Sequence, residues 1–184
     1  MSLLYHSLEQ PQVTFSGSGS EIKIPGLDVG GFTSEGTVVW DQSKTLDITT
    51  KIRNTRINQQ LIESVDVSLK GNAREHFFNT EIQSDTLNLN SQIRGELKSN
   101  SWEGTWENGD VSFPGGHFTL QTADTKLVAD WQQDHYHVEP NCWQDDSAKF
   151  CVERLSYRES QADFELSAQH LPVMQFLSPY LPHL

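Results

Sequence analysis

The 184-residue sequence lacks the long hydrophobic runs that place a chain in a membrane. No apolar stretch approaches the roughly 20 residues that a helix needs to cross a bilayer. The opening residues Met1-Ser2-Leu3-Leu4-Tyr5 have neither the charged start nor the apolar run of a signal peptide. We therefore expect the chain as given to be soluble.

Basic residues are scarce: 13 Lys and Arg stand against 25 Asp and Glu, which gives a net charge of −12. Nucleic acids and anionic membrane faces are bound by basic patches, so the charge excludes nucleic acid as a partner. The hydrophobic content of 35% is lean, but it lies above the range of disordered chains.

Cysteine occurs only at Cys142 and Cys151, the two ends of the segment CWQDDSAKFC. The C-x₂₋₄-C pairs of zinc sites and the C-x-x-C of thioredoxin-like sites are both absent. The spacing favours a disulfide that closes a hairpin loop, over two separate buried thiols or a metal site. A disulfide would indicate an oxidising compartment such as the periplasm. The intervening Asp145 and Asp146 lack the further oxygen ligands that calcium requires.

Catalytic signatures are also missing. The sequence contains no G-x-S-x-G, H-E-x-x-H or Cys–His motif, so we predict neither enzyme activity nor a cofactor. In DHYHVE, His135 and His137 would point to one side of a strand, and a metal site there would need His117 or Glu139 as a further ligand. We favour the simpler arrangement, in which both histidines face solvent and Tyr136 faces inward.

The sequence does have a dominant hydrophobic period of two. In ESVDVSLKG, for example, Val65, Val67 and Leu69 alternate with polar residues. This period is typical of strands with one buried and one wet face, and it predicts about ten strands in an antiparallel all-β fold. The other alternating positions are Leu46, Ile48 and Ile52; His76, Phe78, Thr80 and Ile82; Leu87, Leu89 and Ile93; Phe118 and Leu120; Tyr136 and Val138; Phe164 and Leu166.

Turn signals separate these segments, among them Ser84-Asp85, the segment ENGD at 107–110 and SYRESQ at 156–161. The glycines of FSGSGSEIKIPGLDVGG are expected in turns between short strands. A sandwich, a barrel and an open trough all bury alternate residues, so the period does not distinguish them.

Near the C-terminus the period changes to that of a helix. In HLPVMQFLSPYLPHL the residues Val173, Phe176, Leu177 and Tyr180 follow 3.6 spacing, and Pro172 suits the first helical position. We predict a short helix at residues 172–178 that covers an open end of the sheet.

Trp102 and Trp106 would share a strand face, with Gly104 between them. We favour a place in the core, where the glycine admits a neighbouring ring. The alternative is a sugar-stacking platform, which would make the chain a secreted β-sandwich carbohydrate-binding module.

A series of motifs, taken in order, resembles the TamB family (translocation and assembly module subunit). The resemblance covers about residues 60–184 and corresponds to the family's C-terminal region, once catalogued as a domain of unknown function. Residues 1–60 fit its looser strand pattern. The motifs are Gly71 with His76, Gly95, Trp102 with Gly104, Leu120 and Leu127, Cys142 with Cys151, and Leu171-Pro172.

The resemblance implies a single segment of a longer protein related to AsmA-like and bridge-like lipid-transfer proteins. Such proteins are anchored in the inner membrane and cross the periplasm toward an outer-membrane partner, TamA, so this anchorless chain would be a periplasmic segment. The implied fold is an elongated, curled antiparallel β-sheet, an open trough or β-taco with a hydrophobic interior.

Two functions are implied for the trough. It would conduct phospholipids between the membranes, or shelter the strands of nascent outer-membrane β-barrel proteins and autotransporters. The residues that we expect to line the groove are Ile48, Ile52, Val65, Val67, Leu69, Phe78, Ile82, Leu87, Leu89 and Ile93.

Overall fold

The computed structural model describes residues 2–6, 12–39, 45–57, 60–114, 116–122 and 124–171, with residues 2–6 described by their backbone alone. In this part of the chain fourteen strands form one sheet, and every pairing is antiparallel. The strands are β1 Ser2–His6, β2 Gln12–Ile24, β3 Leu27–Val39, β4 Leu46–Ile57, β5 Gln60–Gly71, β6 His76–Ser84, β7 Asn88–Leu97, β8 Ser101–Phe113, β9 Gly116–Leu120, β10 Thr125–Asp130, β11 His135–Val138, β12 Asn141–Gln144, β13 Lys149–Arg158 and β14 Gln161–Gln169.

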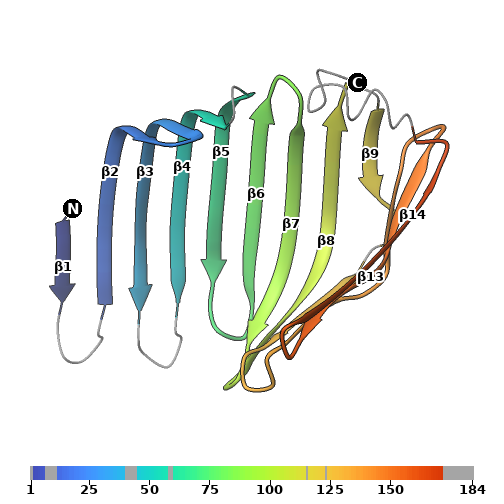
Figure 1. The fold of residues 1–184 in the computed structure, drawn as a ribbon. Helices are drawn as coiled ribbons and strands as arrows, with labels where there is room; N and C mark the ends of the chain where they lie inside the picture. The colour runs from blue at the N-terminus through green and yellow to red at the C-terminus, as the bar shows by residue number, and fades with distance from the viewer. Residues whose placement is uncertain are drawn as a thin grey trace.

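The sheet is elongated and curled, as Figure 1 shows. Strands β1 to β8 follow one another in chain order as a broad wall. Beyond β8 come four short strands, β9 to β12. Of these, β9 and β10 both pair with β8, while β11 and β12 both pair with the longer β13. Strand β14 pairs with β13, and the sheet is left open there among the described residues. The all-β open-trough prediction is confirmed, although about ten strands was too few because four of the later ones have only four to six residues.

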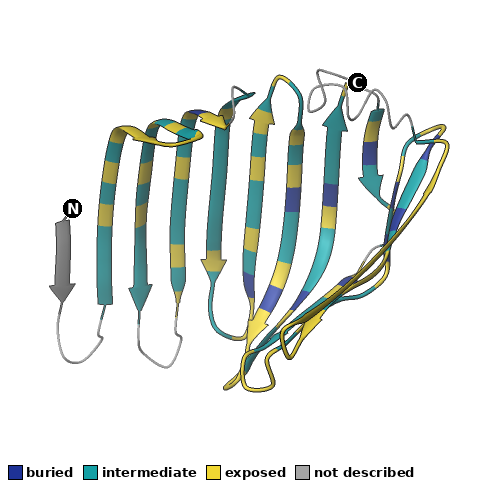
Figure 2. Ribbon diagram, in the orientation of Figure 1, coloured by how far each residue is buried: buried dark blue, intermediate teal, exposed yellow. Residues whose placement is uncertain are grey.

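The packed core is small and lies in one corner of the sheet, where β8, β9, β12 and β13 meet. Phe118, Trp143 and Ala148 are buried there. Residues that pack against them are only partly buried: Trp106, Val111, Phe113, Leu120, Phe150 and Leu171. Figure 2 shows the broad wall of β2 to β7 almost wholly in the intermediate and exposed colours.

The surface area agrees with this distribution of burial. The chain exposes 12194 Å², whereas a compact protein of this mass would expose about 9000 Å². Among the described residues, most of the sheet therefore has its strands paired edge to edge but nothing packed on its faces.

Two turn predictions were wrong because the glycines concerned lie inside strands. The glycine-rich segment forms one long hairpin of β2 and β3, and only Gly26, with a φ of 80°, is in its turn. The segment at 107–110 lies within β8, whose register shifts between Trp106 and Asn108. There Gly109 lies under the ring of Trp143, a long-range contact that local turn signals do not contain.

The helix predicted at residues 172–178 lies outside the described residues. Leu171, the last described residue, packs against the corner core.

The two cysteines form the disulfide that their spacing favoured. Cys142 of β12 and Cys151 of β13 are direct cross-strand partners, with Cα atoms 4.0 Å apart. The bond closes the loop in which Asp145 accepts hydrogen bonds from the backbone N–H groups of Ser147 and Ala148. These two bonds hold the pKa of the Asp145 carboxyl below its usual value, and they give this aspartate a turn-stabilising role.

Replacing both cysteines with serine is expected to lower the free energy of unfolding by about 2.5–3 kcal/mol, because the open loop gains entropy in the unfolded chain. The measurement is urea denaturation of the oxidised protein and of the double variant. The wild-type protein under a reductant is the matched control and should lose the same stability. A loss below about 1 kcal/mol in both would contradict the expectation.

Candidate functional site: an uncharged apolar sheet face

Strand register gathers the predicted groove residues on one face of the wall. Directly paired residues share a face, and the pairings form rows that run across the strands. Of the ten predicted residues only Leu87 lies outside a strand, directly before β7. We call the side of the sheet that carries the other nine residues the inner face. One row is Ile48, Leu69, Phe78, Ile93 and Trp106; a second is Ile52, Val65, Ile82, Leu89 and Val111; Thr50, Val67, Thr80 and Ser91 lie between them.

The paired rows of the inner face contain no Asp, Glu, Lys or Arg in the described strands. The face is also uncovered, since the nine predicted residues in strands are all intermediate or exposed. Of the eleven large hydrophobic residues with high exposure, only Trp131 lies off this face, in the turn after β10. Exposed hydrophobic surface confined to one side of a sheet marks an interaction surface.

Strands β2 to β5 are each kinked near one end, and the kinks keep apolar residues on the inner face there. Glu21 and Asn54 have positive φ values of 55° and 51°. These two residues, with Gly30 and Glu63, are skipped in the strand register. Gly30 cannot carry a side chain here, because an added Cβ would lie 2.8 Å from the Cβ of Asn54. Figure 1 shows the tips of β2 to β4 curling beyond these kinks.

The kink shifts the strand alternation by one residue and so keeps apolar residues on the inner face. Beyond the kink, Ile62 pairs with Ser84, which lies on the inner face of β6. Through the same register Ile22, Ile24 and Ile57 also face inward, with 40%, 56% and 43% of their surface exposed. The apolar face therefore extends to the rim of the sheet.

Aromatic rings on the inner face lie over glycines of neighbouring positions. An added Cβ at Gly36 would lie 2.8 Å from the Phe15 ring, so the ring occupies the space that a side chain would take. Rings placed in this way cover the backbone that the glycines would leave exposed. The same arrangement places Phe32 over Gly19 and Trp143 over Gly109.

A histidine–tryptophan pair occupies the inner face where β6 and β8 begin and β7 ends. Trp102 Nε1–H donates to His76 Nε2 over 2.7 Å. An indole nitrogen only donates, so Nε2 accepts and the proton of His76 lies on Nδ1, which donates to the Asn72 carbonyl at 3.0 Å. Gly95 lies beneath, where a Cβ would be 2.6 Å from Trp102 Nε1. Gly71 is the direct cross-strand partner of His76.

The outer face is polar and is held together by hydrogen bonds across the strands. Amide side chains form a ladder in which Asn79 donates to Ser68 at 3.4 Å, Gln92 to Asn79 at 3.0 Å and Asn108 to Gln92 at 3.2 Å. Such a face is suited to water.

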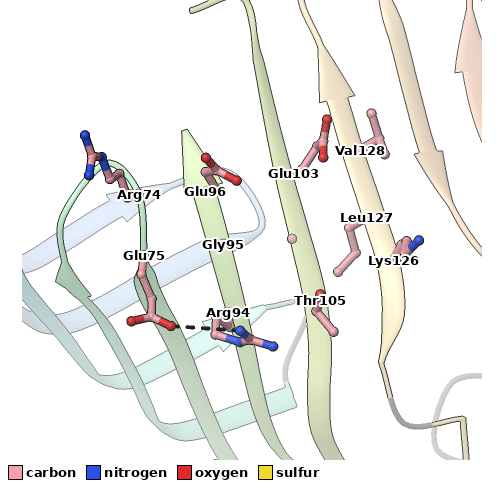
Figure 3. A pocket seen from close by; sticks show the side chains of 11 residues that line it. Arg74, Glu75, Arg94, Gly95, Glu96, Glu103, Thr105, Lys126, Leu127 and Val128 are labelled. Carbon is pink, nitrogen blue, oxygen red and sulfur yellow. Dashed lines mark ion pairs between the residues drawn. The ribbon is translucent and has the colours of Figure 1, made fainter. Parts of the chain in front are cut away.

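A hollow of about 230 Å³ lies on the outer face between β7, β8 and β10, and Figure 3 shows its lining. Its charged groups compensate one another: Arg94 Nη1 lies 3.9 Å from Glu75, and Arg94 Nε donates to Glu107 at 2.7 Å. The hydrogen bond to Glu107 is the main cause that raises the pKa of Arg94. With three basic and three acidic residues in its lining, the hollow has no marked preference for a charged ligand.

The other candidate residues do not assemble into a site. His135 and His137 stack at 6.2 Å on the outer face, and their neighbours Tyr136 and Val138 face inward as predicted. His117 is bonded to Ser112 on another part of the sheet. No three His, Cys, Asp or Glu side chains in the described ranges are placed to share a metal ion.

The two tryptophans of β8 share the inner face as predicted but have separate partners. Trp106 packs edge-on against Trp143, with ring centroids 5.2 Å apart, and belongs to the corner core. The ring of Trp102 lies over Gly104 and is bonded to His76. The single sheet also shows that the β-sandwich alternative was wrong.

The part of the chain that the structure describes has no helix with the length and hydropathy to span a membrane. No curated protein and no solved structure matches the chain. A family model does: residues 4–183 match the one described as TamB, N-terminal domain. The match reaches well beyond residues 60–184 and gives no support to a place in the family's C-terminal region. The chain belongs to the TamB family, whose members act in translocation and assembly together with TamA.

Proposed function

We propose that this chain is a periplasmic segment of a longer, inner-membrane-anchored TamB protein, and that its inner face shelters phospholipid acyl chains between the inner and outer membranes. The observation that carries the proposal is the inner face itself, apolar and uncharged along its paired rows yet left uncovered. A TamA-like protein in the outer membrane would be the partner of the full-length protein.

The dimensions of the inner face suit acyl chains. Its rows cross the seven strands from β2 to β8, a distance of about 29 Å at a strand spacing of about 4.8 Å. One leaflet of a bilayer has a hydrocarbon thickness of about 15 Å. An acyl chain that lay along a row would stay on apolar side chains for its whole length.

A lipid that moves along the inner face needs apolar contacts without a gap. Moving a lipid into water costs about 0.8 kcal/mol for each exposed methylene, and contact with the inner face offsets this cost. Between the two apolar rows lie Thr50, Val67, Thr80 and Ser91. Their hydroxyl groups add little desolvation penalty where they are hydrogen-bonded, as Thr50 is to Ser34 at 2.9 Å. Headgroups would remain in water at the open side of the trough.

Strands of outer-membrane β-barrel proteins, including autotransporters, are the alternative cargo. They would use the same face for their apolar side chains, but they also need a free sheet edge for their backbone groups. Adducts formed in the trough distinguish the two cargoes.

The test places a photo-crosslinking residue at Val67 or at Ser68, in cells that express the protein containing this chain. The two positions are adjacent on β5 and face opposite sides of the sheet. We expect phospholipid adducts at Val67 and few or none at Ser68. Adducts to outer-membrane proteins at Val67 would replace lipid with protein strands as the cargo. Equal lipid labelling at both positions would overturn the proposal.

A further inference from the structure

Along one margin of the inner face, the strands from β7 to β14 end in a row that carries aromatic residues. Direct pairing aligns six residues in this row: Leu97, Trp102, Ala129, Tyr136, Tyr157 and Ala162. Each is the last or second residue from the end of its strand, so the row is the last one before the turns. We call this row the aromatic belt. It is accessible, since Leu97, Tyr136 and Tyr157 have 46%, 40% and 38% of their surface exposed.

The large side chains of the aromatic belt combine an apolar body with a polar tip. Tyr136 and Tyr157 are the two tyrosines whose side chains the structure describes, and their ring centroids are 5.9 Å apart. No hydrogen bond joins their hydroxyl groups to another described residue. Trp102 adds an indole, whose N–H donates to His76. Such side chains are typical of membrane interfaces, where one end is apolar and the other is wet.

One row further in, the same strands carry only apolar side chains on the inner face. Leu127, Val138, Leu155 and Phe164 are paired in line, and the last two are 41% and 64% exposed. The two rows lie about 7 Å apart, because they are two residues apart along each strand. From the aromatic belt inward, the side chains therefore change from amphipathic to apolar, in the same order as a phospholipid changes from its glycerol region to its acyl chains.

The strand ends of β2 to β4 have no comparable row in the described part of the sheet. At the same margin their last inner-face row consists of Val13, Val38 and Leu46. At the opposite, kinked margin the exposed residues are isoleucines, such as Ile22 and Ile57. The aromatic belt is therefore a local feature of one margin and not a general property of the strand ends.

The turns beyond the aromatic belt are acidic. Asp130 ends β10, Asp134 lies in the turn that follows, and Glu159 lies in the turn between β13 and β14. Two basic residues lie nearby: Arg158, and Lys98, which is already paired with a glutamate at 2.6 Å. A headgroup that projected past the aromatic belt would meet a net negative surface. Such a surface attracts an ammonium group and repels a headgroup of net negative charge.

We propose that the aromatic belt is a headgroup subsite of the trough, which holds the glycerol region of a phospholipid and selects an ammonium-bearing zwitterionic headgroup over an anionic one. Phosphatidylethanolamine has a headgroup of the first kind and phosphatidylglycerol one of the second. The acyl chains would lie on the apolar rows, and the ammonium group would lie near the carboxylates of the turns. The proposal rests on lipid binding by the inner face, but it fails separately if lipid binds there without regard to the aromatic belt.

Fluorine NMR of the whole chain, labelled with fluorotryptophan, locates the bound headgroup. Trp102 lies in the aromatic belt and Trp106 lies two rows further in, about 13 Å along β8. Their signals are assigned with Trp102→Phe and Trp106→Phe. The probes are phosphatidylcholines with a nitroxide either on the headgroup or near the end of one acyl chain.

We expect the headgroup nitroxide to broaden the Trp102 signal more than the Trp106 signal, and the acyl-chain nitroxide to reverse this order. No broadening by either probe would overturn lipid binding by the inner face and the subsite with it. Broadening without this order would overturn the headgroup subsite alone.

Headgroup selection is measured with vesicles of equal parts phosphatidylethanolamine and phosphatidylglycerol that have the same acyl chains. The chain is incubated with the vesicles and reisolated, and its bound lipid is quantified by mass spectrometry. We expect phosphatidylethanolamine to be enriched about fivefold at low ionic strength, the size of effect that exposed charges produce, and less at high salt. Bound lipid in the proportions of the vesicles would overturn the selection.

Two double variants separate the acidic turns from the overall negative charge of the chain. Asp134→Asn with Glu159→Gln should remove most of the enrichment, while Asp130 is kept because it accepts hydrogen bonds from the turn backbone. Asp28→Asn with Glu35→Gln, on the outer face of β3, is the matched control of equal charge change and should keep the enrichment. An equal loss in both double variants would assign the preference to net charge and overturn the selective subsite.

Discussion

Replacing Trp143 with alanine is expected to lower the free energy of unfolding by about 3–5 kcal/mol, the usual cost of truncating a large buried aromatic residue. Trp143 is 5% exposed and stacks on Phe150 at 6.0 Å. It also covers Gly109 of β8 and lies in the only buried hydrophobic cluster of the described residues. The described residues offer no second core to compensate for the cavity.

Trp131→Ala is the matched control. Trp131 lies in the turn after β10 with 48% of its surface exposed, so its removal should change stability by less than about 0.5 kcal/mol. Urea denaturation followed by near-ultraviolet circular dichroism measures both variants. Equal, small losses would show that the corner of β8, β9, β12 and β13 does not hold the sheet together.

The sequence predicted the faces of the strands well because alternation is a local property. Val65, Val67 and Leu69 lie on one face of β5 as their spacing required, and the partner strands continue their rows. Alternation alone did not predict that this face is open, and only the family resemblance implied it. Covered and uncovered sheets have the same period of two, and only the positions of the other strands distinguish them.

Glycines were the main source of error, for a physical reason. Gly19 and Gly109 were predicted to lie in turns, yet each lies in a strand under an aromatic ring from another strand. The rings belong to Phe32 and Trp143, 13 and 34 residues away in sequence. No local pattern reports a contact over such a distance.

The motif residues behind the family resemblance acquire a physical explanation in the structure. Gly71, His76, Gly95 and Gly104 are cross-strand partners in one row of the inner face. The indole of Trp102 lies across this row and donates to His76. These glycines leave room for the partly buried hydrogen bond between Trp102 and His76, which sequence spacing alone does not reveal.

Val67→Arg should reduce phospholipid transfer by at least about tenfold, because an unpaired charge on an otherwise uncharged row costs several kcal/mol when acyl chains displace its water. Val67 lies between Thr50 and Thr80, at the middle of the inner face. It is only partly buried, so without cargo the arginine can extend into the open trough and the sheet should stay folded.

Ser68→Arg is the matched control, with the same side chain on the adjacent residue of the polar outer face, and it should leave transfer unchanged. Transfer of a fluorescent phospholipid between liposomes measures function, and urea denaturation measures stability for the same preparations. Unfolding by Val67→Arg alone would mean that the inner face is a covered core, contrary to the open sheet. Normal transfer by both folded variants would remove this face from the lipid route. Only loss of transfer in a folded Val67→Arg protein, beside normal Ser68→Arg, fits an exposed apolar surface that lipid occupies in transit.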